Sequence, residues 1–447
     1  MPLNYSTLQE LYNCFKQSNT VCTDTRRIEA GNMFFALRGD HFDGNTFVLE
    51  ALRRGAAFVV TDCPDTARAA ADKARCLLVA DTLQALQLLA NFHRRQLPSL
   101  LAVLALTGSN GKTTTKELIR AVLQSNFRTV ATEGNLNNHL GVPLTLLNIK
   151  PDTEIAVVEM GANHQQEIRQ LCGIAQATHG LITNIGMAHL EGFGGIEGVE
   201  KGKSELFEYL LMNKGYAFVN ENDERVARRG TFFDQKTAYG NISNAQKGYV
   251  CGHIVAVSPF VQVRRQYADG SFMDINTQLT GAYNTDNILA AVAIGEHFGI
   301  TPQQIKTAIE GYAPVNNRSQ MKMWGNNRLI LDYYNANPTS MAAALSNLAT
   351  LPDEGKKCVI LGDMYELGDY SQAEHEAIVD KLQKMSLENI VLVGEHFSKA
   401  AGTMGLHCPI FANSEAAKIW FNAQIFDNCI ILIKGSRGVA LERLFQM

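Results

Sequence analysis

Short runs of apolar residues recur along the chain at intervals that suit alternating strands and helices. An unbroken run at 100–106 has the length of one strand, and runs of this kind are typical of parallel strands buried on both faces. Helix-length segments separate the runs, so we expect an α/β protein with a doubly wound sheet. The other predicted strands are 32–37, 57–61, 154–159, 180–184, 216–220, 329–332, 358–362, 389–394 and 429–434.

Helical patterns and local composition divide the chain into three predicted domains. Residues 84–96 predict a helix, and Pro98 interrupts the pattern after it. The stretch 231–280 alternates polar with apolar residues, which indicates an antiparallel extension, and 313–318 resembles a linker. Further helices are expected at 290–298 and 303–310. The predicted domains are a small α/β domain at 1–98, a central doubly wound domain at 99–316 and a Rossmann-like α/β domain at 317–447.

Composition excludes several classes of protein. The 447 residues include 40 Lys and Arg against 44 Asp and Glu, and a net charge of -4 gives no field that gathers nucleic acid or anionic lipid. No apolar run approaches the ~18 residues that cross a bilayer. The N-terminus lacks a signal-peptide pattern, and the nine cysteines show no C-x-x-C spacing. We therefore expect a soluble cytoplasmic protein without a nucleic-acid or membrane partner.

A glycine-containing turn follows the most apolar strand and opens a predicted helix at 117–123. Glycines let the backbone approach phosphate oxygens, and free N–H groups at a helix start bind anions. Lys112 would reach the β- and γ-phosphates of ATP, and the Thr113 hydroxyl would ligate Mg²⁺. Leu106 stands where the full phosphate-loop pattern has Gly, so this loop is a shortened one. The expected ATP contacts in the loop are Gly108, Ser109, Asn110, Gly111, Lys112, Thr113 and Thr114.

Four further polar residues carry weaker signals. Glu159 ends a strand, where a carboxylate can reach a phosphate-bound Mg²⁺, although an ordinary solvated acid fits equally well. His189 follows another strand, and a lone histidine is more often a packed or surface residue than a ligand. Lys201 and Lys203 lie among acids, and the pattern alone favours a solvated helix start.

Together these segments resemble the central domain of the Mur ligases, which join amino acids or peptides to UDP-N-acetylmuramoyl precursors of the bacterial cell wall. The resemblance extends over essentially the whole chain. Residues 23–47 are similar to the N-terminal UDP-binding domain, and 281–287 and Asn317-Arg318 resemble the adenine-side and hinge motifs. Two positions depart from the family pattern: Tyr283 stands where His is common, and Asn316-Asn317 where Pro-Gly is common.

Four stretches resemble the family member that adds D-alanyl-D-alanine: 134–143, 334–338, 362–368 and 434–437. The Asp-Asn-Pro-Arg signature of the member that acts before it in the pathway is absent from the sequence. The resemblance thus implies an ATP- and Mg²⁺-dependent amide ligase. It would join D-alanyl-D-alanine to UDP-N-acetylmuramoyl-tripeptide through an acyl phosphate, and we expect it to be a monomer.

The resemblance also implies roles for individual residues. The implied metal ligands are Thr113, Glu159, His189 and Lys203. Lys203 aligns with a lysine that many members carry as a carbamate, and Lys201 competes for that place. The implied catalytic residues are Lys112, His189, Lys203 and Arg318. Further ATP contacts would be Asn284, Asn287, Arg318, Asp332 and Asn335. UDP-sugar-peptide contacts would be Thr25, Arg26, Asn135 and Asn138, and dipeptide contacts Lys434, Ser436 and Arg437.

Other classes of function remain as alternatives. A sister ligase would add a single amino acid or extend a folate or polymer tail, although the N-terminal UDP-type motif argues against folate. A scaffold that binds ATP without ligase chemistry would not need the set of Lys112, Thr113, Glu159 and His189. A nucleic-acid motor would need a basic surface or an aromatic-basic patch, and the sequence has neither.

Overall fold

The computed structural model of the chain describes residues 6–70, 72–241, 248–315, 317–351 and 356–445. Its internal contacts divide the chain into two compact units. The first unit contains residues up to 105 together with 127–161 and 169–179, and the second contains 106–126, 162–168 and the chain from 180 onward. Asn316 of the predicted linker, and 242–247 of the predicted antiparallel stretch, lie outside the described residues.

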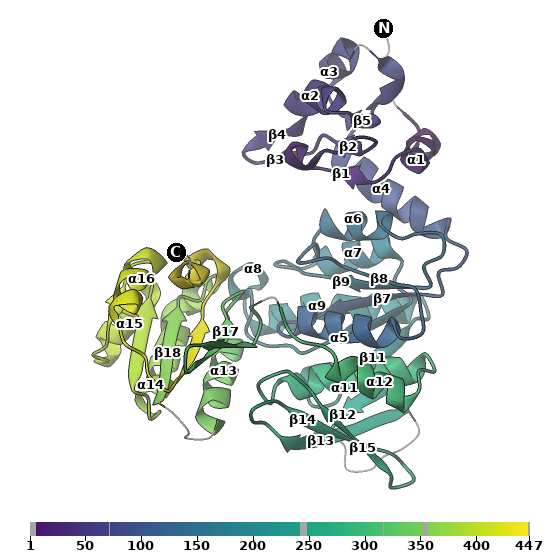
Figure 1. Ribbon diagram of the computed structural model, residues 1–447. Coiled ribbons are helices and arrows are strands. Elements are labelled where there is room, and N and C mark those ends of the chain that lie inside the picture. Colours follow the sequence, from purple (N-terminus) through teal and green to yellow (C-terminus); the bar gives the residue numbers. More distant parts are fainter. Residues whose placement is uncertain (1–5, 71, 242–247, 316, 352–355, 446–447) are drawn as a thin grey trace. The chain divides into compact units, whose positions relative to one another are not determined.

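The N-terminal part of the first unit is a parallel sheet with the order β1-β2-β5-β6 (Figure 1). Phe34 and Val59 on the strands pack with Val48 and Ala51 of a flanking helix to form its core. The strands are β1 (Val21–Cys22), β2 (Met33–Phe35), β5 (Phe58–Thr61) and β6 (Cys76–Leu78), with a small hairpin of β3 (Arg38–Gly39) and β4 (Phe42–Asp43). The helices are α1 (Leu8–Lys16), α2 (Val48–Arg53), α3 (Pro64–Ala69) and α4 (Thr82–Arg95).

The middle of the chain forms a nine-stranded sheet with the order β15-β14-β13-β12-β11-β10-β7-β9-β8. Every residue of β7 and β9 is buried, as expected for strands covered on both faces. The predicted antiparallel extension is confirmed for β13 to β15, whereas β12 and β13 run parallel. The strands are β7 (Ala102–Thr107), β8 (Thr129–Ala131), β9 (Ile155–Glu159), β10 (His179–Ile182), β11 (Tyr216–Asn220), β12 (Lys236–Gly240), β13 (Tyr249–Ala256), β14 (Gln262–Gln266) and β15 (Phe272–Asn276).

Helix α11 (Asn284–His297) is the most buried helix of the second unit. It packs against α5 (Lys112–Leu123), α12 (Pro302–Glu310), β12 and β13, and it is apolar nearly all round, as a core helix must be. It begins earlier than the predicted 290–298 because polar side chains of its first turn hydrogen-bond within the protein. The other helices of the middle region are α6 (Gly141–Leu147), α7 (Glu167–Ala175), α8 (Leu190–Phe193), α9 (Ile196–Met212) and α10 (Glu224–Gly230).

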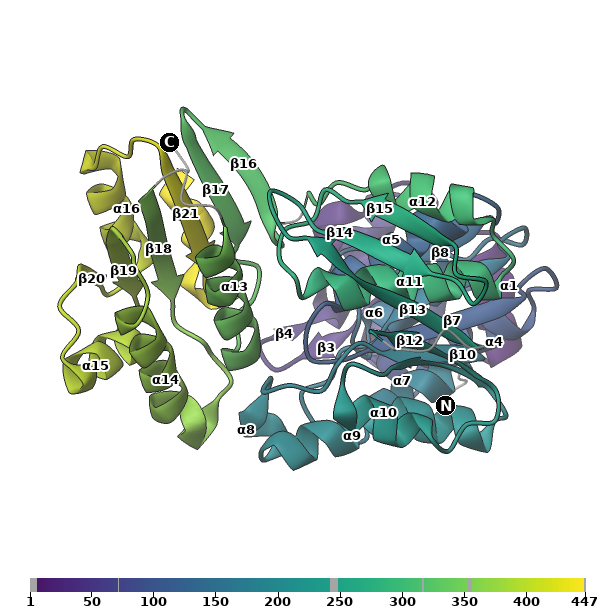
Figure 2. The same cartoon turned by 90° about the horizontal axis from the view of Figure 1, so that it is seen from below.

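The C-terminal part of the second unit is a six-stranded sheet with the order β16-β17-β21-β18-β19-β20. All neighbours are parallel except β16 and β17, which form a hairpin at one edge (Figure 2). The four predicted strands are confirmed, and β16 and β20 are additional ones. The strands are β16 (Gln320–Trp324), β17 (Asn327–Asp332), β18 (Lys356–Gly362), β19 (Asn389–Val393), β20 (Ile410–Phe411) and β21 (Cys429–Lys434).

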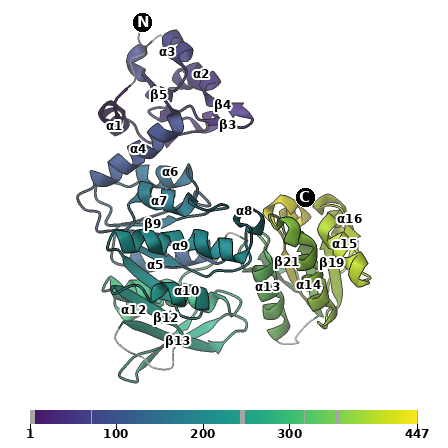
Figure 3. The same cartoon turned by 180° about the vertical axis from the view of Figure 1, so that it is seen from behind.

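Helices cover both faces of this C-terminal sheet. Alternate residues of β17 and β21, such as Leu329 and Ile431, join the core under α16 (Ser414–Ala423). On the other face, α13 (Pro338–Thr350) packs beside α14 (Ser371–Gln383), and α14 packs beside α15 (Glu395–Met404) (Figure 3). The predicted α/β class with parallel sheets is therefore confirmed. Across the described ranges, none of the helices is long and apolar enough to cross a membrane.

Candidate active site

The predicted phosphate loop lies between β7 and α5. Gly108 has φ +145° and Gly111 has φ +79°, a region that L-residues rarely adopt. A Cβ atom at Gly108 would lie 2.0 Å from Thr183 Oγ1, and one at Gly111 would lie 2.5 Å from Asn287 Oδ1. The loop therefore needs glycine at both positions for backbone conformation and for close packing.

Lys112 opens α5 and folds back over the loop. Its Nζ donates to the carbonyl oxygens of Gly108, at 2.6 Å, and Ser109, at 3.3 Å. The Lys112 ammonium group thus donates to two backbone oxygens. Phosphate oxygens of a ligand could accept hydrogen bonds from it in the same way. Thr113, the next residue, is 2% exposed. The position of a cation at the first turn of a helix that follows a glycine-containing turn suits an anionic ligand.

The segment after β10 braces the phosphate loop from one side. The Asn110 amide donates to Asn184 Oδ1, and the Ser109 hydroxyl donates to the carbonyl of Gly186. The hydroxyl of Thr183 donates to the carbonyl of Asn110 at 2.6 Å. This explains why the family-like stretch 183–189 accompanies the loop: its first residues hold the loop's backbone in place.

Asn284 and Asn287, the predicted adenine-side residues, are buried and tie α11 to α5. Thr115 Oγ1 donates to Asn287 Oδ1 at 2.8 Å, Asn287 Nδ2 donates to Asn284 Oδ1, and Asn284 Nδ2 donates to the carbonyl of Thr280. Both amides thus have a bracing function that sequence reasoning missed. Their contact with a nucleotide stays a prediction.

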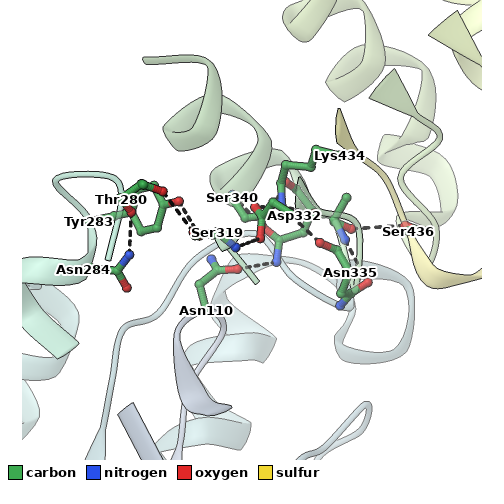
Figure 4. Close-up of polar contacts among 12 residues, drawn as sticks. Asn110, Thr280, Tyr283, Asn284, Ser319, Asp332, Asn335, Ser340, Lys434 and Ser436 are labelled. Carbon is green, nitrogen blue, oxygen red and sulfur yellow. Dashed lines mark hydrogen bonds and ion pairs between the residues drawn. The ribbon is translucent and has the colours of Figure 1, made fainter. Parts of the chain in front are cut away.

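A chain of polar contacts runs from Tyr283 through Ser319 to the C-terminal sheet (Figure 4). The hydroxyls of Tyr283 and Ser319 lie 2.6 Å apart, and the Ser319 amide donates to Asp332 Oδ1 at 3.0 Å. Asp332 Oδ2 accepts from Lys434 Nζ at 2.7 Å, and Lys434 also donates to the carbonyl of Asn335. Burial raises the pKa of the Tyr283 phenol, so this hydroxyl stays neutral. Three predicted site residues, Asp332, Asn335 and Lys434, are therefore brought together.

The start of helix α13 meets the phosphate loop. Asn337 Nδ2 donates to Asn110 Oδ1 at 2.8 Å, while Asn337 also caps α13 through the amide of Ser340. Nearby, the Met187 amide donates to Thr339 Oγ1. Asn337 lies in the family-like stretch 334–338, but no role was predicted for it. Its place before Pro338 was the available signal, because Asn followed by Pro is a favourable helix start.

Tyr334 lies under two predicted ligand-binding arginines. The Arg318 guanidinium carbon is 3.8 Å from the centre of the Tyr334 ring, and that of Arg437 is 5.3 Å away. Arg437 Nη1 also donates to the Tyr334 hydroxyl at 3.4 Å. One aromatic ring therefore positions a residue predicted to bind ATP and another predicted to bind the dipeptide.

His189 begins α8 with φ +54°, and its Nδ1 lies 2.5 Å from Glu366 Oε2. Contact with His189 lowers the pKa of the Glu366 carboxyl. Glu366 was not predicted as a site residue.

The two candidate lysines differ sharply in environment. Lys203 is completely buried, donates to the carbonyl of Ala162 at 3.0 Å, and has a pKa well below the usual lysine value because of its burial. Lys201 is exposed.

Glu159, Asn135 and Asn138 belong to the first unit. Glu159 is 1% exposed, and its carboxylate accepts a hydrogen bond from Asn137 Nδ2 at 2.8 Å. Asn137 was not among the predicted site residues. Asn138 Oδ1 accepts from the amide of Gly141 and so braces the start of α6. Asn135 and Asn138 are both exposed.

Thr25 and Arg26 lie in the N-terminal sheet region of the same unit. The Arg26 side chain is paired with Asp24, and this hydrogen bonding lowers the pKa of the Asp24 carboxyl to about 2. The Thr25 carbonyl accepts from Arg54 Nη1. Their contact with a uridine diphosphate stays a prediction.

Two of the expected Mg²⁺ ligands, Thr113 and His189, have side chains whose chemistry suits a metal that substrate and water also bind. Within the described ranges, no group of three His, Cys, Asp or Glu side chains could hold a metal by itself. Thr113 would contribute a hydroxyl oxygen, and phosphate oxygens and water would complete the shell, as is usual for Mg²⁺. His189 fits as a ligand because a carboxylate occupies its Nδ1 side, which leaves Nε2 for a metal.

Comparisons with known proteins cover the whole architecture. The model of the Mur ligase family, catalytic domain, matches residues 18–94. The Mur ligase middle domain matches 106–295, and the Mur ligase, glutamate ligase domain, matches 317–437.

Two curated relatives share the name UDP-N-acetylmuramoyl-tripeptide--D-alanyl-D-alanine ligase. The protein of Escherichia coli (strain K12) is 35% identical over 95% of this chain and 92% of its own length. The protein of Bacillus subtilis (strain 168) is 36% identical over 95% of this chain and 92% of its own.

Solved structures show the same fold. A crystal structure of MurF from Acinetobacter baumannii has a TM-score of 0.85 and 32% identity, covering 99% of this chain and 98% of that one. MurF ligase from Thermotoga maritima in complex with ADP has a TM-score of 0.82 and 23% identity, covering 96% of each chain. With its phosphate loop and these matches along nearly its full length, the chain belongs to the Mur ligase family.

Proposed function

We propose that this protein joins D-alanyl-D-alanine to UDP-N-acetylmuramoyl-tripeptide with consumption of ATP, in the synthesis of peptidoglycan precursors. The observation that carries the proposal is the similarity, over 95% of the chain, to relatives named for this ligase. The phosphate loop supports it, because two required glycines and Lys112 form a site suited to an anionic ligand.

The reaction overcomes the poor electrophilicity of a carboxylate. The acceptor carboxylate attacks the γ-phosphorus of ATP, which releases ADP and leaves an acyl phosphate. The amine of D-alanyl-D-alanine then attacks the acyl carbon, and the tetrahedral intermediate expels phosphate to leave an amide. The phosphoryl group needs alignment and charge neutralisation more than covalent help. Lys112 would neutralise charge at the phosphates, and Arg318 would do so from its place over Tyr334.

Mg²⁺ would neutralise phosphate charge and reduce repulsion between the γ-phosphate and the attacking carboxylate. Thr113, Glu159, His189 and Lys203 are the residues we propose to hold it. Lys203 would serve as an oxygen ligand only if it carries a carbamate, which mass spectrometry of the intact protein in bicarbonate buffer would detect. Asn284, Asn287, Asp332 and Asn335 are proposed ATP contacts.

The N-terminal and C-terminal domains would hold the two substrates other than ATP. Arg437 is exposed and its guanidinium can bind the carboxylate of the incoming dipeptide in a bidentate manner, with Ser436 and Lys434 beside it. Thr25 and Arg26 would hold the uridine diphosphate, and Asn135 and Asn138 the sugar-peptide. We propose the domain limits 1–98, 99–316 and 317–447, a monomeric enzyme and a cytoplasmic location, which suits these substrates.

Phosphate release from ATP tests the reaction. We expect release only when Mg²⁺, UDP-N-acetylmuramoyl-tripeptide and D-alanyl-D-alanine are all present, with a product heavier by the dipeptide. Release with a free amino acid in place of the dipeptide would instead indicate a sister ligase. ATP binding without release for any amine would favour a scaffold.

The substitution Lys112→Met distinguishes an enzyme from a scaffold more clearly than phosphate release by the unaltered protein alone. It should lower turnover by about 100-fold or more, because the phosphoryl transfer loses a positioned cation. Lys399→Met is the matched control, since it removes an exposed lysine of α15 and should keep full turnover.

A further inference from the structure

The contact between His189 and Glu366 joins two distant segments at two points. Glu366 Oε2 lies 2.5 Å from His189 Nδ1, and the Glu366 carbonyl accepts from the amide of Glu191 at 3.2 Å. Both His189 and Glu366 have positive φ, at +54° and +63°. Such backbone conformations cost free energy in residues other than glycine, and they persist only where surrounding contacts impose them.

The segment that carries Glu366 is itself rigidly held. The Met364 amide donates to His375 Nε2 at 3.0 Å, and the Tyr365 amide donates to Ser436 Oγ at 3.0 Å. Asp363, at the start of the segment, accepts from backbone amides at the beginning of α15, and its carbonyl accepts from the Ser436 amide. The position of Glu366 is therefore fixed by the C-terminal sheet and its helices.

A carboxylate on one side of an imidazole determines what the other side can do. The His189 side chain is 19% exposed, and the carboxylate that faces its Nδ1 is that of Glu366, at 2.5 Å. Placing the ring proton on Nδ1, toward Glu366, leaves the lone pair on Nε2. Metal-binding histidines commonly have such a carboxylate behind them, and it fixes both tautomer and ring orientation.

We propose that Glu366 is a positioning residue that reaches from the C-terminal sheet to His189 and orients its imidazole for Mg²⁺, so that this metal site is completed only when the two segments are in contact. The inference rests on the proposed function, because it uses His189 as a metal ligand. Ser436, a proposed dipeptide contact, holds the same segment through Tyr365. Glu366 thereby links the part of the protein that would receive the dipeptide to the metal site.

The test measures metal affinity rather than activity. Mn²⁺ replaces Mg²⁺, and the signal of free Mn²⁺ in electron paramagnetic resonance gives the dissociation constant of the full chain with the non-hydrolysable analogue β,γ-methylene-ATP. Glu366→Gln keeps the size of the side chain and removes its charge. It should weaken Mn²⁺ binding by about 10-fold or more. Glu415→Gln is the matched control, because Glu415 is similarly exposed and paired with Arg443, and it should leave the affinity unchanged.

A double-mutant cycle distinguishes positioning from a general structural effect. His189→Ala alone should weaken Mn²⁺ binding, and adding Glu366→Gln to it should produce no further loss, because Glu366 acts only through His189. Unchanged affinity in Glu366→Gln, or fully additive losses, would overturn the inference while leaving the proposed function intact. If His189→Ala leaves the affinity unchanged, the metal role of His189 fails and the inference fails with it. Failure of the proposed function itself would appear separately, as absence of phosphate release in the unaltered protein.

Discussion

Lys434 and Asp332 are paired across two neighbouring parallel strands of the C-terminal sheet. They are register partners on β21 and β17, and Lys434 Nζ lies 2.7 Å from Asp332 Oδ2. The Lys434 side chain is 2% exposed and that of Asp332 16% exposed. A solvated lysine is excluded here, because the ion pair is buried and its Asp332 carboxylate also accepts from the Ser319 amide. Contact of Lys434 with the dipeptide stays a prediction.

Asp332→Ala should destabilise the protein by about 3 kcal/mol or more, because it leaves the buried Lys434 ammonium without its counter-charge. Urea unfolding followed by circular dichroism measures this. Asp380→Ala removes one partner of the exposed pair Asp380–Lys384 and should change the free energy of unfolding by less than about 0.5 kcal/mol. Equal effects of the two substitutions would show that the Asp332 pair contributes nothing beyond a surface contact.

Gly108→Ala should abolish ATP binding, because its Cβ would collide with Thr183 Oγ1 in a backbone conformation that alanine avoids. Gly402→Ala, in α15, is the control. No atom beyond the neighbouring backbone of its own helix lies within 4 Å of the added Cβ, and the protein should gain about 0.5–1 kcal/mol of stability as alanine replaces glycine in a helix. Titration calorimetry with an ATP analogue and thermal unfolding compare the two. ATP binding retained by Gly108→Ala would contradict the phosphate-loop assignment.

The buried His375 should make stability fall in mild acid. Burial lowers its pKa, and the neutral ring donates from Nδ1 to the Ser371 carbonyl while Nε2 accepts from the Met364 amide. Because the folded-state pKa lies below the unfolded value of about 6.5, the unfolded state binds more protons in this range. The stabilisation is therefore complete above about pH 6.5 and is lost as the pH falls from there toward the lowered folded-state pKa.

Urea unfolding between about pH 8 and pH 5 tests this linkage. The decline in the free energy of unfolding should be smaller in His375→Gln, whose amide can still donate and accept but does not titrate. His41→Gln, which changes an exposed histidine, controls for the loss of one histidine. A decline in His375→Gln as steep as in the unaltered protein would exclude His375 as a cause of the acid sensitivity.

Arg437→Lys should raise the KM for D-alanyl-D-alanine by about 10-fold or more with little change in the KM for ATP, because lysine cannot bind a carboxylate in a bidentate way. Arg443→Lys, at another exposed arginine of the C-terminal region, should leave both constants unchanged. Steady-state phosphate release at varied concentrations of each substrate gives the values. An increase confined to the KM for ATP would instead place Arg437 on the nucleotide.

Much of the fold was predictable because buried parallel strands can be recognised as short apolar runs in the sequence. β7, β9 and β21 are apolar up to their last residue, and the structure places all three where the pattern predicted them. β16 was missed because it lacks an unbroken apolar run, and three of its five residues are exposed at a sheet edge. The start of α11 was missed because its first turn is polar, although Asn284 and Asn287 satisfy each other inside the protein.

The sequence by itself determined the phosphate loop, the succession of strands and helices, and the resemblance to the family, because each depends on residues close together in the chain. The tertiary structure alone decided that Asn337 meets Asn110 across 227 positions and that Lys434 is paired with Asp332 across 102. It also decided that Glu366 faces His189. The spacing of apolar residues along a helix or strand indicates which of its faces is buried. It does not indicate which distant polar side chains then come within hydrogen-bonding distance.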